Sequence, residues 1–507
     1  MAPSKSQIDA WGHIGNSGWS WEALKPYYKK AHTLALPSEA VRDHMHINYI
    51  DDEVRGRSGP IQVSFPEDNN LISKAWIETF ETLGYNLTTD PFSGEALGGF
   101  GNSLTLDPKT KTRSYSTQYY KAAQGRPNLH VETGVEAHKI LLKGEGENVV
   151  AHGVEYAQNG EIKTVQARLE VIVAAGAFNS PRLLELSGIG NAKHLQSLGI
   201  EVKVDNPFVG ENLQDHLMTG ISYELPDQLP EGVSTMDSLR RGEPEAIQAA
   251  MQAYKTNGSG PLSVGAVMCY SYMGLVDLVK EPGQTKLKQL LDEHLGGEQK
   301  DFPSQKFQYD HIRAILENPK EGTASYFLTP TQGSWGNGAL LPGNWFTLGA
   351  AFLTPFSRGN IHIASADPTK KAILDPKYLS HPLDIEFHAR HLQYLNTITK
   401  TQPLAGFLKP GGKRGPEIAE KTEDLDAAKA YLQKTVLSNW HSTSTCAMMP
   451  RELGGVVDSR LIVYGTKNVR VVDSSIMPMI VRANTQSTVY AVAERAADFI
   501  KQDHALV

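Results

Sequence analysis

The sequence predicts a mixed fold, α/β plus α+β, and three stretches support that prediction. Residues 469–472 are mostly β-branched, as in a buried strand, and a loop then leads to a helix with one apolar face over 485–500. Two further strand-like segments, 149–157 and 164–173, also lead into a helix. Residues 354–365 instead form a turn followed by a strand. The chain is therefore expected to combine strand–helix units with a separate sheet region.

Length, charge and cysteine content restrict the class of protein. A chain of 507 residues can form two domains, or one large domain with an ample core. Its net charge of −7 argues against nucleic acid as the main partner. The sequence has no apolar run long enough for a membrane span and no signal-like start, so a cytoplasmic location is the default expectation. Cys269 and Cys446 are expected to be buried thiols rather than a disulfide.

Two pairs of histidines have spacings that metal ligands also use. These are His44 with His46, and His388 with His391. No converging set of carboxylates, thiols or further histidines accompanies them, so no metal site is predicted. A solvated helix face is the simpler interpretation of His388 and His391. The Gly-rich, charged stretch 404–420 is expected to be an exposed loop.

The C-terminal strand, loop and helix place two polar residues at a helix start. His441 opens a Ser/Thr-rich turn, and Asn484 directly precedes the helix that is expected to begin near Thr485. The exposed N–H groups of a helix start favour an electron-rich group. His441 and Asn484 could therefore act as an acid/base group and a hydrogen-bond donor beside a cofactor. A structural histidine and an ordinary N-cap remain equally open interpretations of the residues alone.

This stretch resembles the C-terminal end of the glucose–methanol–choline (GMC) oxidoreductases, flavoenzymes that oxidise alcohols with FAD. The matching positions are His441, Thr445, Cys446, Met448, GVVD at 455–458, VRVVDSS at 469–475, Asn484 and AERAAD at 493–498. Ser444 stands where the family often has glycine. The sequences of residues 451–458 and 482–498 are most similar to those of fungal members, many of which act in secondary metabolism.

Two segments in the first half of the chain strengthen the resemblance. Residues 174–190 match the second signature of the family, and Ser180-Pro181 within them predicts a helix start with serine as the N-cap. Residues 206–216 match a GENLQDH motif. Within that motif, Asn212 and Asp215 are interpreted as turn residues and His216 as a structural histidine. The alternative is that all three line the substrate side.

The resemblance implies a truncated Rossmann-like FAD-binding domain and a substrate domain built on an antiparallel sheet. The FAD-binding domain is expected to comprise residues 1–60, 121–216 and 437–507. Residues 61–120 are expected to form a substrate or inter-domain segment, and residues 217–436 the substrate domain. Two strands are expected within 128–142, and the loop-rich part 225–345 is expected to vary with the substrate.

The Gly-rich turn that holds the FAD pyrophosphate in the family is absent from this sequence. Residues 9–30 resemble a family segment that follows a strand–turn–helix with the G-x-G-x-x-G pattern. The glycines at 99–101 and 144–146 do not replace that pattern and are expected to lie in loops. Three explanations are open: an incomplete coding sequence or shortened protein, loss of FAD binding, or weak FAD binding through the remaining contacts. The first is preferred, because the catalytic end is unimpaired.

By the resemblance, the protein is an FAD-dependent dehydrogenase or oxidase that converts a small-molecule alcohol to a carbonyl. His441 would take the hydroxyl proton, Asn484 would hydrogen-bond the substrate oxygen, and the hydride would pass to the flavin. The positions expected to contact FAD are Ala137, Asp473, Asn484, Thr485 and Gln486. Two alternatives are a non-redox cyclase or dehydratase on the same scaffold, and a remnant without FAD. The oligomeric state is not predicted.

Overall fold

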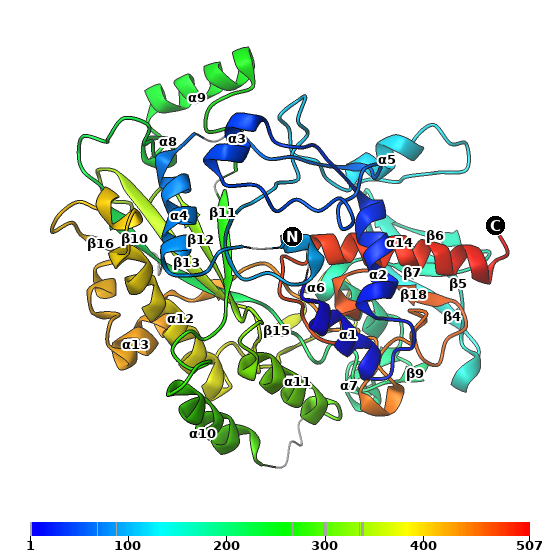
Figure 1. Cartoon of the computed structure of the whole chain (residues 1–507). Coiled ribbons are helices and arrows are strands. Elements are labelled where there is room, and N and C mark those ends of the chain that lie inside the picture. Colours follow the sequence, from blue (N-terminus) through cyan, green and yellow to red (C-terminus); the bar gives the residue numbers. More distant parts are fainter. Residues whose placement is uncertain are drawn as a thin grey trace.

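The computed structural model describes residues 3–67, 69–87, 89–265, 267–297, 302–333, 335 and 339–506. Figure 1 shows two adjoining parts, one with a large sheet under α12 and α13, and one around α14 and α2. Each part has its own hydrophobic core: Tyr326 and Leu392 belong to the first core, and Val471 and Val492 to the second. The predicted mixture of α/β and antiparallel-sheet architecture is confirmed.

The larger sheet is antiparallel throughout and forms the base of the first part. Its strand order is β16–β10–β13–β12–β11–β3, and β17 also pairs with β10. The strands are β3 (Gly98–Gly101), β10 (Leu217–Glu224), β11 (Cys269–Met273), β12 (Ala324–Thr329), β13 (Trp345–Phe352), β16 (Arg414–Gly415) and β17 (Leu437–Ser438). Helices α4 (Leu71–Thr82), α12 (Pro382–Lys400) and α13 (Leu425–Thr435) pack on this sheet.

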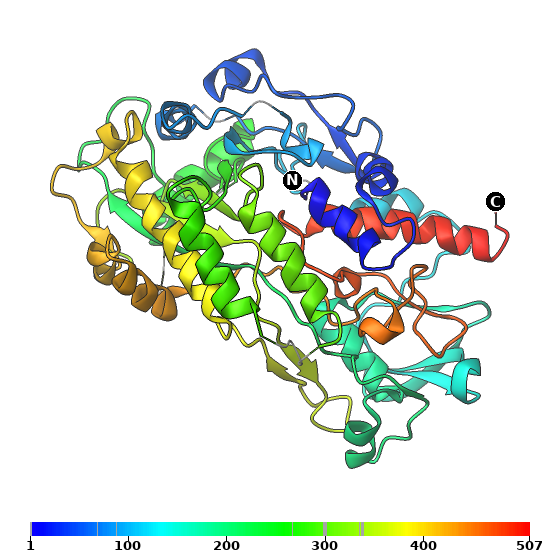
Figure 2. The ribbon, with the colours of Figure 1, turned by 60° about the horizontal axis from the view of Figure 1, so that its bottom comes forward.

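The second part combines a short parallel pair, an antiparallel meander and long helices. Strand β7 (Val171–Val173) pairs in parallel with β18 (Val469–Val471). The meander is β4 (Val135–Lys143), β5 (Val150–Gln158) and β6 (Glu161–Gln166). Helix α14 (Gln486–Asp503) packs against α2 (Trp21–Ala31), and α6 (Gly176–Leu186) packs against β4. Figure 2 shows α14 extending from the middle of the molecule to its edge.

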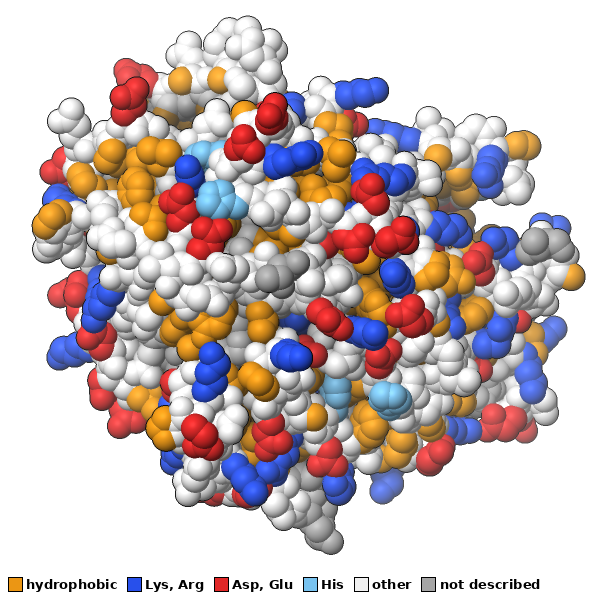
Figure 3. All heavy atoms as spheres, viewed as in Figure 1, with side chains coloured by type: hydrophobic (Ala, Val, Ile, Leu, Met, Phe, Trp, Pro, Cys, Tyr) orange, Lys and Arg blue, Asp and Glu red, His pale blue; other side chains and the backbone are white. Residues whose placement is uncertain are grey.

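The parallel pair β7–β18 leaves apolar side chains at the surface. Ile172 on β7 is 46% exposed, and Phe178 on α6 is 39% exposed. Parallel sheets are normally covered on both faces. In this structure, therefore, the β7–β18 pair is not fully covered on both faces. On the face shown in Figure 3, acidic and basic side chains are interspersed.

The predicted helix start at Ser180-Pro181 is wrong. Helix α6 begins at Gly176, so Pro181 lies inside it. Proline lacks an N–H and cannot donate to the carbonyl four residues earlier, that of Ala177. The Thr445 hydroxyl donates to Ala177 O instead, at 2.6 Å. A side chain from the distant C-terminal stretch thus satisfies the carbonyl and allows the helix to continue through the proline.

Two loop predictions also need correction. Residues 98–101 form the edge strand β3, and a Cβ on Gly99 would lie 2.8 Å from the Phe80 ring, so glycine permits close approach of α4. The stretch 404–420 buries Leu404 and Ala419 and contributes β16 to the sheet. Apolar contacts that the local sequence does not reveal therefore order both segments.

Two other segments differ from prediction in their secondary structure. Only the second of two strands expected within 128–142 forms, as β4, because residues 128–134 are solvent-exposed and pair with no strand of the described chain. The described residues of the part 225–345, which was expected to be loop-rich, include the helices α8 (Asp237–Arg240), α9 (Pro244–Asn257), α10 (Gly283–Leu295) and α11 (Gln305–Glu317).

His388 and His391 lie on the buried face of α12 and not on a solvated face. His388 Nε2 lies 3.1 Å from Ala350 O, and His391 contacts the hydroxyls of Thr323 and Tyr326 at 3.0 and 2.9 Å. The hydrogen-bond partners come from β12, β13 and the residue before β12, and they make burial of the rings possible. Burial lowers the pKa of His388 to about 4 and that of His391 to about 3.

A buried ion pair fastens β18 to the segment before β7. Arg470 Nε lies 2.8 Å from Glu170 Oε2, and these side chains are 1% and 5% exposed. Breaking a buried pair leaves an uncompensated charge. We therefore expect Glu170→Ala to lower the free energy of unfolding by about 3 kcal/mol, measured by urea denaturation. The control Glu161→Ala removes an exposed carboxylate and should change it by less than about 0.5 kcal/mol; equal effects would contradict the assignment.

Candidate active site

His441 and Asn484 lie in hydrogen-bond contact, although 43 residues separate them. His441 follows β17, and Asn484 lies in the loop directly before α14. Asn484 Nδ2 is 3.0 Å from His441 Nε2. An amide NH₂ only donates, so His441 Nε2 accepts in this orientation of the amide. The two residues singled out from the sequence therefore form one donor–acceptor pair.

His216 contacts the other nitrogen of the His441 ring. The two Nδ1 atoms are 2.9 Å apart, and the rings are nearly perpendicular. Because His441 Nε2 accepts from Asn484, the neutral His441 ring carries its proton on Nδ1 and donates it to His216 Nδ1. His216 also lines the cavity beside His441, a position that fits the second interpretation of this residue.

Asp215 organises the segment that carries His441. Its carboxylate accepts the His441 backbone N–H at 3.0 Å, the Ser438 hydroxyl at 2.5 Å and the Tyr378 hydroxyl at 2.7 Å. A buried carboxylate with several donors is held firmly in place. Asp215 therefore does more than form a turn, whereas Asn212, at φ 64°, has the left-handed backbone typical of one.

Burial keeps the two histidines uncharged at neutral pH. Burial lowers the pKa of His441 to about 4. The pKa of His216 is held well below its usual value, first by burial and then by the neighbouring His441. Both rings are therefore neutral near pH 7, and His441 Nε2 is able to accept a proton.

Ser444, at a position where the GMC family often has glycine, has a left-handed backbone. It is buried and has a φ of 81°, a left-handed conformation that residues with a side chain rarely adopt. Its hydroxyl lies 2.8 Å from that of Thr443. The serine thus occupies a backbone position that suits glycine, and the local hydrogen bond helps to hold it there.

His441 and Asn484 face a cavity of about 200 Å³ between the two parts of the molecule. The cavity is lined by His216, Met218, Val267, Tyr270, Tyr272, Ser325, Phe327, Leu353, Asn439, Trp440, His441, Arg482 and Asn484. The Trp440 side chain is 77% exposed, so it lies at the rim. The walls are largely apolar and aromatic with a few polar groups, as in sites for small molecules.

Asn484 also lines a second cavity, of about 70 Å³, at the start of α14. The helix contributes Gln486 and Ser487 to this cavity, and Ala31, Ile61, Val63 and Phe92 supply apolar walls. A helix start favours an electron-rich group, and apolar walls suit the face of a flat ring. A cavity of this volume is smaller than a three-ring flavin, so these residues would contact only part of the ring, next to the His441–Asn484 pair.

Of the other positions expected to contact FAD, Thr485 also lies at the start of α14, whereas Asp473 and Ala137 lie away from it. Thr485 is the N-cap residue of α14. Asp473 accepts from Gly176 N at 2.9 Å and from the Ser180 hydroxyl at 2.5 Å, so it fastens the start of α6 to the end of β18. Ala137 is exposed on β4 opposite Tyr156. Asp473 and Ala137 do not line either of these two cavities.

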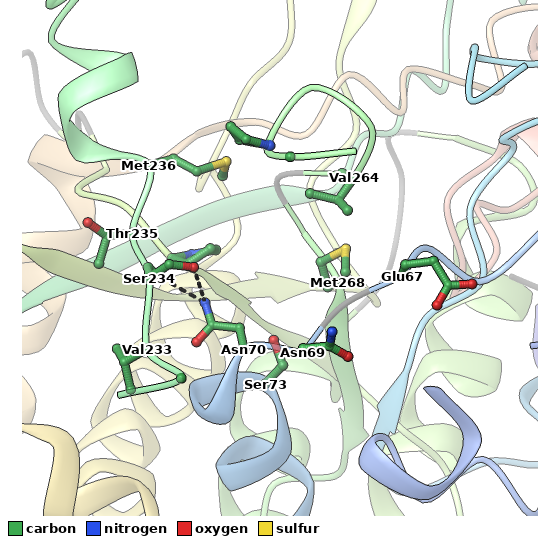
Figure 4. A pocket seen from close by; sticks show the side chains of 15 residues that line it. Glu67, Asn69, Asn70, Ser73, Val233, Ser234, Thr235, Met236, Val264 and Met268 are labelled. Atoms are coloured by element: carbon green, nitrogen blue, oxygen red, sulfur yellow. Dashed lines mark hydrogen bonds between the residues drawn. The ribbon is translucent and has the colours of Figure 1, made fainter. Parts of the chain in front are cut away.

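A larger cavity of about 460 Å³ lies at the start of α4 (Figure 4). In it, Asn70 Nδ2 donates to Ser234 O at 2.8 Å, and Met236, Val264 and Met268 form apolar walls. Glu67 is the one titratable side chain among its described lining residues. A single carboxylate does not provide a pair of acid–base groups, so the smaller cavity at His441 is the candidate active site.

Several residues of this site were not predicted from the sequence. Arg482, Tyr270, Tyr272 and Trp440 all line the cavity. The match of residues 206–216 to a family motif was the available signal for Asp215 and His216. Arg482 and Trp440 border recognised segments but carried no signal of a role, and Tyr270 and Tyr272 reach His441 only through the tertiary fold.

The described part of the chain contains neither a metal-site arrangement nor a helix suited to span a membrane. Across the described ranges, no group of three or more His, Cys, Asp or Glu side chains has the arrangement of a metal site. None of the helices in the described part of the chain combines the length and the hydropathy that crossing a membrane requires.

Comparison with known sequences shows the family. Residues 1–218 match the N-terminal domain, and residues 355–493 the C-terminal domain, of the family described as GMC oxidoreductase. A dehydrogenase of Monascus purpureus, mpl7, is 33% identical over 99% of this chain and 81% of its own length. A GMC oxidoreductase family protein of Malassezia sympodialis is 31% identical over 99% of this chain and 77% of its own length. The chain belongs to the GMC oxidoreductase family.

Solved structures agree with this assignment. An FAD-dependent oxidoreductase from Chaetomium thermophilum superposes with a TM-score of 0.88 at 28% identity, covering 100% of this chain and 84% of the other. A fungal aryl-alcohol oxidase gives a TM-score of 0.82 at 25% identity, covering 99% and 84%. The predicted family and enzyme class, a GMC-type flavin-dependent dehydrogenase or oxidase, are confirmed.

Proposed function

We propose that this chain oxidises a small-molecule alcohol to a carbonyl compound with FAD, and that His441 is the base. The donor–acceptor pair formed by His441 Nε2 and Asn484 Nδ2 at 3.0 Å carries the proposal. A hydroxyl group both donates and accepts, so it matches an acceptor and a donor that face one cavity. The likeness to fungal dehydrogenases supports a role in fungal secondary metabolism.

The chain's own groups handle the hydroxyl proton. The substrate O–H donates to His441 Nε2, while its oxygen accepts from Asn484 Nδ2. Transfer of the proton gives an imidazolium, which the His441 Nδ1–H to His216 Nδ1 hydrogen bond keeps in orientation. Asn484 stabilises the negative charge that develops on the substrate oxygen. Asp215 holds the backbone at His441 and so positions the base.

The start of α14 is the part of this chain that would hold the flavin ring. Asn484, Thr485 and Gln486 lie there, and the helix dipole favours negative charge on a reduced ring. The chemistry that FAD would supply when bound there is acceptance of the hydride from the carbinol carbon. Ala137 and Asp473 stay predicted cofactor contacts, Asp473 acting through the start of α6.

The test is product analysis on the chain supplied with FAD. A panel of primary and secondary alcohols is incubated with the enzyme, and the products are separated and identified. We expect the aldehyde or ketone with two hydrogens fewer than the substrate. A product with the elements of water removed, or one cyclised at an unchanged oxidation level, would contradict the proposal and support a dehydratase or cyclase.

The pH profile should report the low pKa of the base. His441 must be neutral to accept a proton, and burial lowers its pKa to about 4. We therefore expect kcat/KM to stay level from pH 7 down to about pH 5 and to fall only near pH 4. Enzyme returned to pH 7 controls for unfolding in acid. An acid limb at about 6.5, the pKa of an unperturbed histidine, would contradict the assignment.

A further inference from the structure

Arg482 lines the candidate active-site cavity, and its guanidinium group is buried with few partners. The side chain is 1% exposed. Nη1 lies 3.4 Å from Ala96 O and 3.8 Å from Glu321 Oε2, whereas Nε and Nη2 have no hydrogen-bond partner within the described ranges. An arginine has five N–H donors, and a buried charge without partners is costly. The arrangement therefore calls for an acceptor inside the cavity.

Glu321 does not meet that need. It accepts the Ser4 hydroxyl at 2.8 Å and the Ser6 hydroxyl at 2.6 Å, and its contact to Arg482 is longer than a hydrogen bond. The Arg482 guanidinium also lies over the Tyr272 ring, 4.6 Å from its centroid. That contact orients the fork of donors but supplies no oxygen to receive them.

The remaining walls suit an aromatic ring. Tyr270 and Phe327 lie with their centroids 6.1 Å apart, and both line the cavity together with Tyr272. The cavity volume is about 200 Å³. An engineered apolar cavity of about 150 Å³ accommodates benzene, so one substituted ring fits here. Arg482 lines the same small cavity as His441 and Asn484, and one molecule can therefore contact all three.

We propose that Arg482 binds a carboxylate on an aromatic alcohol whose hydroxyl lies at His441 and Asn484. The inference rests on the proposed function and names its substrate class, an aryl alcohol that also carries an acidic group. A carboxylate offers two oxygens in one plane, the geometry that the guanidinium fork matches.

The test compares binding of benzoate and benzamide, which have the same ring and nearly the same shape. Isothermal titration calorimetry is performed on the full chain supplied with FAD. We expect benzoate to bind at least about ten times more tightly than benzamide. Arg482→Met should abolish the difference, and Arg482→Lys should keep part of it. Equal affinities in the unsubstituted protein, or a preference that survives Arg482→Met, would overturn the proposal.

Two further variants distinguish loss of the anion site from misfolding of the protein. Arg495 is another buried arginine with an unpartnered Nε in the described chain, but it lies over Trp19 outside this cavity, so Arg495→Met should leave the preference for benzoate unchanged. Glu321→Gln leaves Arg482 in place and removes the negative charge of the carboxylate nearest to it. Because that charge would repel a bound anion, the substitution should tighten benzoate binding. Weaker benzoate binding in Glu321→Gln would count against the proposal even if Arg482→Met does not fold.

Turnover separates this inference from the proposed function. The pair is benzyl alcohol and 4-(hydroxymethyl)benzoate. Arg482-dependent binding of benzoate without oxidation of either alcohol would leave the anion site standing and refute the proposed function. Oxidation of both alcohols with equal kcat/KM and no preference for benzoate would refute the anion site and leave the proposed function standing.

Discussion

His441→Ala is expected to lower kcat by at least about 1,000-fold, because it removes the group that the Asn484 contact positions to take the hydroxyl proton. The measurement is steady-state turnover of an alcohol by the chain supplied with FAD. The fold should persist, since Asp215 contacts the His441 backbone and not its ring. Melting temperature and flavin absorbance should therefore stay close to those of the unsubstituted enzyme.

Two observations distinguish loss of the base from a general defect. Added imidazole should restore part of the rate of His441→Ala, since it can enter the vacated space and accept the proton. His13→Ala, which removes an exposed histidine that does not line the cavity, should leave kcat unchanged. A His441→Ala enzyme that keeps a rate within tenfold of the original would show that another group is the base.

Asn484→Asp is expected to reduce kcat/KM by about 100- to 1,000-fold, the usual effect of losing a donor to a developing oxyanion. The substitution conserves shape but replaces the NH₂ group with an oxygen facing His441 Nε2. The new carboxylate would also raise the pKa of His441, since it stabilises the charged ring. The acid limb of the pH profile should therefore move upward from about pH 4.

Asn484→His is the matched control, because a histidine N–H can still donate to the substrate oxygen. It should keep more activity than Asn484→Asp at pH 7. If Asn484→Asp left both kcat/KM and the acid limb unchanged, Asn484 would not contact the reacting oxygen.

The C-terminal strand, loop and helix could be predicted because local patterns specify them. The β-branched strand β18 and the amphipathic α14 need no distant partner to be recognised, and Asn484 lies between them. Their meeting with His441 was inferred from the family resemblance. The structure adds the hydrogen bond between Asn484 and His441. It also adds a second contact of His441, with the His216 ring.

The features that the sequence did not reveal depend on contacts between distant segments. Pro181 lies within a helix because Thr445 satisfies a carbonyl from 268 residues away. His391 is buried because Thr323 and Tyr326 supply hydroxyls to both ring nitrogens. Arg482 reaches the active site from a loop, and a loop carries no periodic pattern from which a side chain's direction could be read.

The most direct test of the account is reduction of the bound flavin by an alcohol in the absence of oxygen. The chain is purified, supplied with FAD if necessary, and its visible spectrum is recorded before and after the alcohol is added. We predict that the flavin bands bleach in the unsubstituted enzyme and persist in His441→Ala. A chain that binds no FAD, or a bound flavin that no alcohol reduces, would contradict the proposed function.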